Sequence, residues 1–436
     1  MRFLITFFAI FLVFSFVQSQ SYTSYFTGSE IDKAVDNQKF ALTVMGGGTE
    51  VDYAMRLFLE DAKGGDILVL RTSGSDGYND YMYSELGIDV NSVETIVCHN
   101  RDASSDPYVL ERIFKAEAIW FAGGDQWKYL SFWRDTPLQQ YINFALLDKG
   151  TAIGGTSAGL AIMGSYQFTA ENGTVTSEQA LADTYNERMT IDNRPFLIMP
   201  LPVPIIFDSH FDDPDRRGRL VAFMARIKKD YGEYVMGIGL DEYTAARFEG
   251  AEMIMLNDAW EEQEDFTHIY SYDCNIEPLN FIAEPGIPLT WDSDHIKYRK
   301  FRSSPSPVTF VKLTNNSVNV IPDEDNAINI VDGEYQISEE NYLEFPTPCG
   351  LVSSVQHENM DQIHIFPNPT WNNLAIEKGR KEIKKVSVFS VNGKDITETS
   401  SISNNDNLDV SNLPPGIYFL KILVDEKQIV RKFIKL

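Results

Sequence analysis

The chain is poor in cysteine and in positive charge, and each shortage excludes a class of protein. Its 436 residues include 3 cysteines, too few for a disulfide framework and without the paired spacings of a structural zinc site. It has 37 Lys and Arg against 63 Asp and Glu, so a phosphate-neutralising surface and a nucleic-acid partner are not expected. Stability must come from packing, although one bridge between Cys274 and Cys349 stays open.

Long apolar runs are also scarce, and the one that stands out lies at the amino terminus. Residues 3–17 are almost all apolar and follow Arg2. The run is shorter than the ~20 residues that a bilayer requires, and it is typical of a signal peptide with cleavage near Ser19 and Gln20. We therefore expect residues 1–19 to be a signal peptide and the mature protein to be secreted or held at the outer cell surface.

Beyond the leader, short apolar runs alternate with helical periodicity, which predicts a parallel sheet wrapped by helices. The predicted strands are 40–45, 66–70, 93–98, 118–122, 151–155, 204–207 and 235–240. The predicted helices are 51–62, 108–115, 138–147 and 216–231. We expect one α/β domain over residues 20–265, with its ligand at the carboxyl ends of the strands.

The pattern changes twice after this domain. Residues 266–355 read as short β-like runs, which we interpret as a β-rich extension of the catalytic domain. Residues 363–436 carry 11 Lys and Arg against 8 Asp and Glu, the reverse of the preceding balance, and read as short strands. The sequence therefore predicts a small all-β sandwich over residues 356–436.

Three motifs in this last segment resemble the sorting domain of proteins exported by the type IX secretion system. They are Phe366-Pro367-Asn368-Pro369, the turn from Leu413 to Tyr418, and the closing Lys432-Phe433-Ile434-Lys435-Leu436. The resemblance implies that this domain is a partner of the secretion machinery and directs passage across the outer membrane. An ordinary β accessory module is the alternative.

A nucleophile motif follows the predicted strand 151–155. Gly155-Thr156-Ser157-Ala158-Gly159 has the GxSxG form of a sharp turn between a strand and a helix. Small residues fit such a crowded turn, and the turn lifts the serine oxygen above the sheet. The pattern predicts Ser157 as a nucleophile, with the alternative that the turn serves packing alone.

A serine nucleophile requires a histidine to take its proton, and the chain has six. Four lie in the extension or near the carboxyl terminus, which leaves His99 and His210 after predicted strands. We favour His210, which precedes an arginine cluster, and interpret His99 as a hydrogen-bonding residue at a strand end.

A second glycine-rich turn follows the predicted strand 118–122. In Gly123-Gly124-Asp125-Gln126 the glycines let a ligand approach the backbone. We expect the N–H groups of Gly124 and Ala158 to form an oxyanion hole, and Gln126 to hydrogen-bond substrate.

Four ordered motifs together resemble the cyanophycinase and peptidase E group of serine peptidases. They are Gly123 to Gln126, Gly154 to Gly159, Asp208-Ser209-His210-Phe211 with Arg216 to Leu220, and Gly237 to Glu242 with Thr244-Ala245. The resemblance implies a flavodoxin-like, three-layer parallel sheet akin to class I glutamine amidotransferases. It also implies Ser157 as nucleophile and His210 as base, with Gln126, Asp208, Arg216 and Arg219 near the substrate, and no metal or organic cofactor.

The acidic member of the catalytic group is less defined. The family places it between serine and histidine, and here that stretch offers Glu171 and Glu178, of which we prefer Glu178. Glu242 is a third candidate. The chain also departs from cyanophycinases at Ser209, where they have glutamine, and at Pro214, where they have arginine.

The arginine cluster carries a charge argument of its own. Arg216, Arg217 and Arg219 form a positive patch in a strongly acidic chain, and arginine forks match carboxylates. The alternative is that these arginines pair with the aspartates beside them, at 212, 213 and 215.

We therefore expect a secreted serine hydrolase that cleaves aspartyl or isoaspartyl peptide bonds, as in cyanophycin, through an acyl-enzyme. One alternative is an α/β-hydrolase esterase, because GxSxG also fits that fold. Another is a surface-displayed binding protein that kept the fold and lost turnover. The sequence leaves open whether the protein forms a homodimer.

Overall fold

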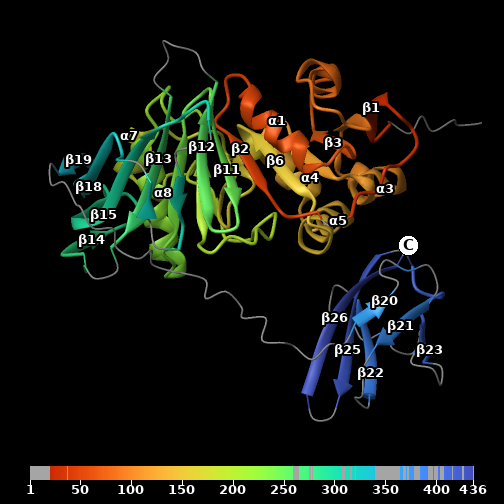
Figure 1. Cartoon of the computed structure of the whole chain (residues 1–436). Coiled ribbons are helices and arrows are strands. Elements are labelled where there is room, and N and C mark those ends of the chain that lie inside the picture. The colour runs from red at the N-terminus through yellow and green to blue at the C-terminus, as the bar shows by residue number, and fades with distance from the viewer. Residues whose placement is uncertain are drawn as a thin grey trace, which may run out of the picture.

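The computed structural model describes most of the chain up to residue 338 and parts of the carboxyl-terminal region (Figure 1). The described residues are 20–36, 38–258, 265–273, 276, 278–306, 310–314, 317–319, 321–338, 364–366, 370, 373–377, 383–390, 396, 401–402, 407–414, 416–424 and 427–435. The predicted signal peptide and the cysteine pair 274 and 349 lie outside them.

The first sheet is mixed, with a parallel centre. In spatial order, its described strands are β1 (Tyr22–Gly28), β4 (Ser92–Cys98), β3 (Asp66–Arg71), β5 (Ala118–Phe121), β6 (Ala152–Thr156), β2 (Leu42–Met45), β11 (Thr244–Glu249), β12 (Glu252–Asn257), β16 (Phe310–Lys312) and β17 (Ser317–Val318). The neighbours from β4 to β2 are parallel, whereas β1 and the strands from β11 onward join antiparallel. The carboxyl ends of the parallel strands therefore meet at one edge.

Helices cover both faces of the parallel centre, which explains why its strands are continuous apolar runs. The described helices are α1 (Asp52–Asp61), α2 (Gly77–Asp80), α3 (Pro107–Lys115), α4 (Gln126–Trp133), α5 (Pro137–Phe144), α6 (Ala158–Ala161), α7 (Ser177–Ala182) and α8 (Arg217–Tyr231), with short 3-10 or π turns at Tyr81–Glu85, Arg101–Ser105 and Ala145–Lys149. Helix α1 packs on one face through Phe58 and Leu59, and α3, α5 and α6 pack on the other. Nowhere in the described part of the chain is there a helix long and apolar enough to cross a membrane.

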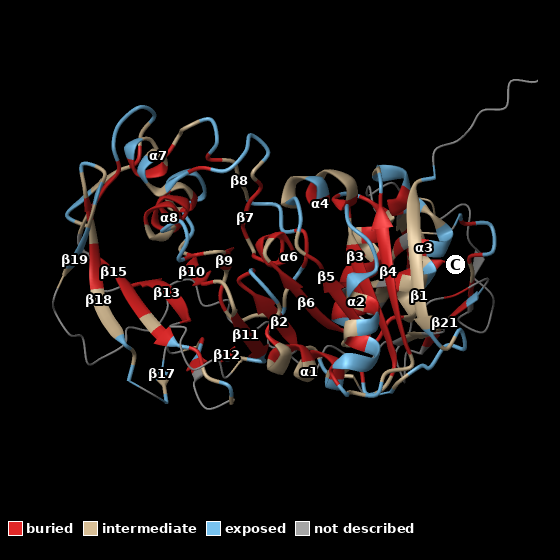
Figure 2. Cartoon of the chain, turned by 90° about the horizontal axis from the view of Figure 1, so that it is seen from above, coloured by how far each residue is buried: buried red, intermediate tan, exposed pale blue. Residues whose placement is uncertain are grey.

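A second sheet contains strands from both sides of residue 265. Its described strands, in spatial order, are β19 (Glu334–Ser338), β18 (Glu324–Val331), β15 (Thr290–Arg302), β13 (Phe266–Tyr272), β10 (Met236–Leu240) and β9 (Ile205–Asp208), with β14 (Asn280–Ile282) paired to β15. A small antiparallel pair, β7 (Gln167–Phe168) with β8 (Ile191–Asp192), lies near α7 and α8 (Figure 2). Strand β13, after the predicted boundary at 265, pairs with β10 before it, so the predicted extension shares a sheet with residues of the predicted α/β domain.

The predicted strands and helices up to residue 240 are all present, with ends that differ by a few residues. The expected parallel sheet is present at the centre, from β4 to β2, whereas β1 and the strands from β11 onward are antiparallel. Strands β9 and β10 are parallel to each other but belong to the second sheet. Strand β11 is joined to β12 by residues 250 and 251 alone, and so short a connection cannot make the crossover that a parallel pair requires.

The carboxyl-terminal region is β-rich. One described sheet holds β20 (His364–Phe366), β21 (Asn373–Glu377), β24 (Asn407–Asp409) and β23 (Ser401–Ile402), and another holds β22 (Ile383–Ser390), β25 (Gly416–Val424) and β26 (Lys427–Lys435). Leu374 and Leu408 from the first sheet share a core with Val388, Leu420 and Phe433 from the second. This region therefore has a hydrophobic core of its own.

Candidate active site

The candidate nucleophile sits on a strained turn between β6 and α6. Ser157 has φ 53° and ψ -113°, a conformation that favours glycine. Its N–H donates to the Met45 carbonyl oxygen at 3.1 Å, which ties the turn to the end of β2. A Cβ atom on Gly159 would lie 2.2 Å from the Phe121 carbonyl oxygen, so a glycine is required there for steric reasons. The turn thus presents the Ser157 hydroxyl at the carboxyl edge of the sheet.

A histidine meets this hydroxyl from the end of β9. The Ser157 Oγ lies 2.7 Å from the His210 Nε2. His210 also has a positive φ, 46°, and its N–H donates to the Gly46 carbonyl oxygen at 2.8 Å. His210, two residues after the end of β9, is therefore held against the glycine loop that follows β2, in a position suited to take the serine proton.

The carboxylate that contacts the base comes from the turn between β10 and β11. The Oε1 of Glu242 lies 2.5 Å from the His210 Nδ1, and the Glu242 N–H donates to Asp212 Oδ1 at 3.1 Å. Glu178 and Glu171, in contrast, are exposed on α7 and on the loop before it. Of the candidate acids, Glu242 and not the preferred Glu178 contacts the base, which corrects the placement that the sequence favoured.

This correction has a physical reason in the topology. The expectation took the acid from the stretch between serine and histidine, whereas β10 lies beside β9 and delivers the turn at 241–243 directly to the base. The acid therefore follows the histidine in the chain. The signal that could have found it was the placement of Glu242 immediately after a predicted strand.

The second glycine-rich turn lies against the nucleophile. A Cβ atom on Gly123 would lie 3.7 Å from the Ser157 Cβ, and Gly124 has φ +158°. The Tyr129 hydroxyl fixes this turn by donating towards the carbonyl oxygens of Ala122, at 2.8 Å, and Gly123, at 3.1 Å. Ala158 is the first residue of α6, so its N–H has no acceptor within the helix. Of the two predicted oxyanion-hole residues, Ala158 is thus next to Ser157 in the chain, and Gly124 belongs to the turn that lies against Ser157 in space.

A cavity of about 200 Å³ opens beside the Ser157–His210 pair. Its lining includes Ser157, His210, Gln126, Ala161, Phe168, Ala170, Thr174, Phe207, Asp208, Ser209, Arg216 and Arg219. The Gln126 amide donates to the Phe168 carbonyl oxygen at 3.2 Å. All predicted substrate-binding residues therefore lie around one cavity, together with aromatic rings that sequence reasoning did not single out.

The two predicted substrate arginines have different surroundings. Arg219 makes a two-pronged ion pair with Asp208, at 2.5 and 2.8 Å, and both side chains are 5% exposed. Its remaining Nη1 donates to Thr174 Oγ1 at 2.8 Å and to the Val175 carbonyl oxygen at 3.2 Å. Arg219 and Asp208 thus satisfy each other at the wall of the cavity.

Arg216 is less completely paired than Arg219. Its Nη1 donates to the Ser209 carbonyl oxygen at 2.7 Å and lies 3.9 Å from Asp208 Oδ1. Within the described residues, its buried Nε has no hydrogen-bond partner. Burial, together with the neighbouring charge of Arg219, lowers the pKa of Arg216, and the nearby carboxylates of Asp208, Glu242 and Asp212 oppose this shift only in part. Arg217, the third arginine of the cluster, pairs with Asp215 at 2.6 Å, as the alternative interpretation held for it.

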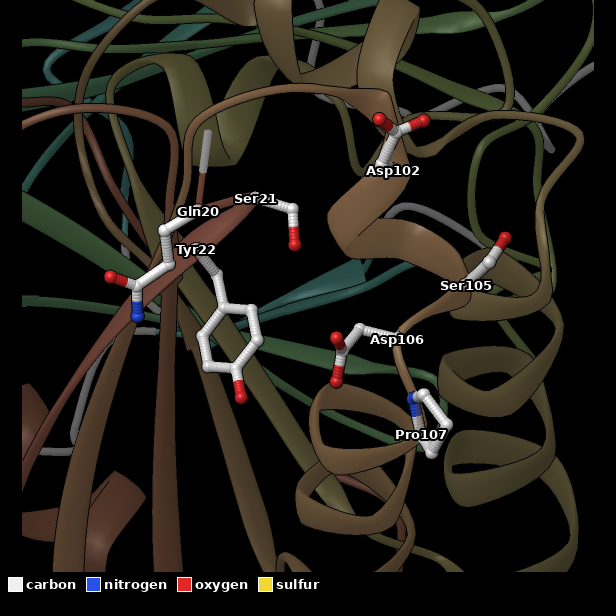
Figure 3. Close-up of a pocket in the computed structure, with 7 residues that line it drawn as sticks. All are labelled: Gln20, Ser21, Tyr22, Asp102, Ser105, Asp106 and Pro107. Atoms are coloured by element: carbon white, nitrogen blue, oxygen red, sulfur yellow. The ribbon is translucent and has the colours of Figure 1, made fainter. Parts of the chain in front are cut away.

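A larger pocket, about 540 Å³, lies between the start of β1 and the N-terminus of α3 (Figure 3). Tyr22 and Asp106 project into it, and Asp102 lies at its rim. Three strands separate β1 from β6 in the sheet, a distance of roughly 20 Å at the usual spacing. His99 is near this edge and bonds Thr23 Oγ1 at 2.8 Å, so it is not part of the site at Ser157.

Two family models match the chain. Residues 76–256 match Peptidase family S51, and residues 364–436 match the secretion system C-terminal sorting domain. Both segments agree with the resemblances drawn from the motifs.

Relatives of the first segment carry the name cyanophycinase. The protein of Geminocystis herdmanii is 28% identical over 175 residues, which cover 40% of this chain and 57% of that protein. The protein of Trichormus variabilis is 26% identical over 168 residues, covering 38% and 50%. This chain therefore spans about half the length of the curated relatives it matches.

A crystal structure of a peptidase from an acI-B1 Actinobacterium is 18% identical to the chain, with a TM-score of 0.39. The match covers 53% of this chain and 90% of the peptidase chain. The family model and the curated relatives indicate a serine peptidase. The chain thus contains a Peptidase family S51 domain followed by a secretion system C-terminal sorting domain.

Proposed function

We propose that the protein is a secreted serine peptidase of cyanophycinase type that hydrolyses an aspartyl or isoaspartyl bond. The observation that carries the proposal is the continuous chain of contacts from Ser157 Oγ to His210, at 2.7 Å, and from His210 to Glu242, at 2.5 Å. A hydroxyl, an imidazole and a carboxylate in this order are the groups that acyl transfer requires. The finer fold assignment, a flavodoxin-like three-layer domain, belongs to the same proposal.

The reaction begins when the Ser157 Oγ attacks the carbonyl carbon of the scissile bond. Its proton passes to His210 Nε2, and Glu242 stabilises the imidazolium through Nδ1. The carbonyl oxygen becomes an oxyanion, which the N–H groups of Gly124 and Ala158 stabilise. His210 then gives the proton to the leaving nitrogen, the C–N bond breaks, and the acyl group remains as an ester on Ser157.

Water completes the cycle. His210 takes a proton from a water molecule as the water oxygen attacks the ester carbon, and it returns that proton to Ser157 Oγ as the C–O bond breaks. A carboxylic acid leaves, and the hydroxyl is restored. No metal or cofactor takes part in these steps.

Substrate selection in this proposal depends on Arg216. The Arg216 side chain is 19% exposed and lines a small cavity together with Phe168, and one carboxylate of an aspartyl residue would pair with its guanidinium. Arg219 is already paired with Asp208, so it serves the shape and rigidity of the cavity. A cavity of about 200 Å³ suits a short acidic side chain.

Export belongs to the same proposal. The sorting domain over residues 364–436 supports secretion or attachment at the cell surface, and the predicted signal peptide would direct the chain across the inner membrane first. The partners are then a peptide or cyanophycin-like substrate and the secretion machinery.

Mass-spectrometric analysis of products tests the activity. We expect the purified chain to cleave cyanophycin or β-aspartyl dipeptides at the aspartyl carbonyl, and the Ser157→Ala variant to be inactive. Ordinary α-aspartyl peptides and simple esters serve as comparison substrates, and preferential ester turnover would favour an esterase instead.

The departures at Ser209 and Pro214 keep a binding protein without turnover as the competing function. A serine-directed fluorophosphonate probe separates the two. Labelling of the wild type but not of Ser157→Ala supports the peptidase, whereas a folded protein that resists the probe would indicate a binding protein.

A further inference from the structure

A second imidazole–carboxylate pair lies behind the Ser157–His210–Glu242 group. His268, on β13, has its Nε2 at 3.0 Å from Asp241 Oδ1 and its Nδ1 at 2.9 Å from the Tyr298 hydroxyl. The side chains of His268 and Asp241 are 8% and 5% exposed, and neither lines the cavity at the nucleophile. This pair is therefore outside the reach of a substrate bound there.

His268 contacts Asp241 and Phe211, which are next in the chain to Glu242 and His210. Asp241 directly precedes Glu242, and Phe211 directly follows His210. The ring centroids of Phe211 and His268 are 4.8 Å apart. One imidazole thus touches the segment that carries the acid and the segment that carries the base.

The second sheet holds this imidazole rigidly. Strand β13 is paired on one side with β10 and on the other with β15, and His268 stands opposite Gly239 in the register. A Cβ atom on Gly239 would lie 2.5 Å from the Phe211 ring, so that ring fills the place of a side chain beside His268. The Phe266 N–H also donates to Asp241 Oδ2, at 3.2 Å.

The hydrogen bonds fix what His268 contributes. Asp241 is an acceptor, so His268 donates from Nε2, and its Nδ1 bonds the Tyr298 hydroxyl. Removal of the Nε2 donor would leave a buried carboxylate short of a partner, which favours movement of Asp241 towards water. The turn at 241–243 would move with it and carry Glu242 away from His210.

We infer that His268 is a positioning residue that sets the geometry between Glu242 and His210 through Asp241 and Phe211. The inference rests on the proposed function and deepens it, because it assigns a role in that site to a residue of the second sheet. A displacement of about 1 Å at a reacting group can lower a rate by about 100-fold.

A pair of amide variants tests the inference. The amide nitrogen of His268→Gln can occupy the place of Nε2 and donate to Asp241, whereas that of His268→Asn reaches only the place of Nδ1. We expect the rate of fluorophosphonate labelling at Ser157 to fall about 100-fold in His268→Asn, and to stay within about tenfold of wild type in His268→Gln. On a dipeptide substrate, the loss should appear in kcat with little change in KM.

Thr267→Val is the matched control on the same strand. The Thr267 hydroxyl is buried and, within the described residues, has no hydrogen-bond partner, so the rate should stay at the wild-type value. If His268→Asn does not fold, Phe211→Leu tests the other contact, with an expected loss of about tenfold. Wild-type rates in folded His268→Asn, or in Phe211→Leu, would overturn the inference.

An NMR measurement separates failure of this inference from failure of the proposed function. The proton shared by His210 Nδ1 and Glu242 should give a far-downfield resonance, assigned by its loss in His210→Asn. We expect the resonance in wild type and His268→Gln and its loss in His268→Asn, whether or not the protein turns over a substrate. An unchanged resonance in His268→Asn would contradict positioning, and inert wild-type protein would contradict the function alone.

Discussion

Gly47 and His210 are packed so closely that a Cβ atom on Gly47 would lie 2.3 Å from the imidazole Cε1. Gly47 also has φ +115°, and its carbonyl oxygen accepts the Tyr243 N–H at 3.0 Å. The glycine loop after β2 is therefore the wall against which the imidazole stands, and it is linked to the turn that carries Glu242.

Gly47→Ala should cost activity more than stability. The methyl group would displace the His210 ring from Ser157, and we expect kcat/KM to fall about 100-fold. The strained φ should also lower the free energy of unfolding by about 1–2 kcal/mol. Gly77→Ala is the control, because a Cβ atom there meets nothing within 4 Å. Equal activity in the two variants would contradict the role of the close contact.

Glu242→Gln should lower kcat strongly, whereas Glu178→Gln should leave it unchanged. A glutamine at position 242 no longer stabilises the imidazolium, and the loss in a comparable triad is of the order of 10⁴-fold. Glu178 is exposed on α7, so loss of its charge should not reach the site. Steady-state kinetics on one β-aspartyl dipeptide would decide, and a larger effect at 178 would restore the original expectation.

Loss of charge at Arg216 should weaken substrate binding, whereas loss of charge at Arg219 should lower the stability of the fold. Arg216→Gln should raise KM about tenfold or more for a substrate with a free carboxylate, with little change in thermal stability. Arg219→Gln leaves Asp208 buried without its partner, and we expect the free energy of unfolding to fall by about 3–5 kcal/mol.

The comparison requires kinetics and denaturant unfolding on the same preparations. A stable, wild-type-like Arg219→Gln protein with a raised KM would mean that Arg219, and not Arg216, contacts the substrate.

Glu117 should make the protein less stable as pH rises towards neutrality. Burial raises the pKa of this carboxyl to about 7, and its Oε2 accepts the Asp66 N–H at 2.9 Å. Between the unfolded pKa, near 4.5, and about 7, the folded state binds more protons than the unfolded state, so stability falls as pH increases through this window. After allowance for the partly compensating Lys149 and for solvent screening, the change should be about 1–3 kcal/mol.

Urea unfolding at pH 5, 6, 7 and 8 measures this slope. Glu117→Gln keeps an oxygen that can accept the Asp66 N–H but cannot ionise, so its stability should vary less over the window. Identical slopes in the two proteins would show that the carboxyl titrates as it does in the unfolded chain.

Local signals in the sequence singled out Ser157 and His210, and the structure brings their side chains together. The turn around Ser157 and the strand before His210 are both specified by neighbouring residues, but β6 and β9 belong to different sheets, so the contact between the two side chains is a tertiary property. The two residues lie 53 positions apart in the chain and meet at 2.7 Å.

The acid and the state of the arginines could not be predicted in the same way. Glu242 reaches His210 because β10 pairs with β9, and pairing between strands of a second sheet is a tertiary property. Whether Arg219 is free depends on its contact with Asp208 across 11 residues, and charge composition alone does not distinguish it from Arg216. The antiparallel strands at the edges of the first sheet were not predicted for a similar reason, because strand direction depends on connection length as well as on strand pattern.

The strained backbone of Ser157 also means that a substitution there can raise thermal stability and abolish catalysis together. A glycine would relax at φ 53° and ψ -113°, so Ser157→Gly should melt at a higher temperature than wild type and hydrolyse nothing. Selection of this protein for thermal stability alone would favour that inactive variant. A screen for variants of higher melting temperature must therefore measure turnover as well.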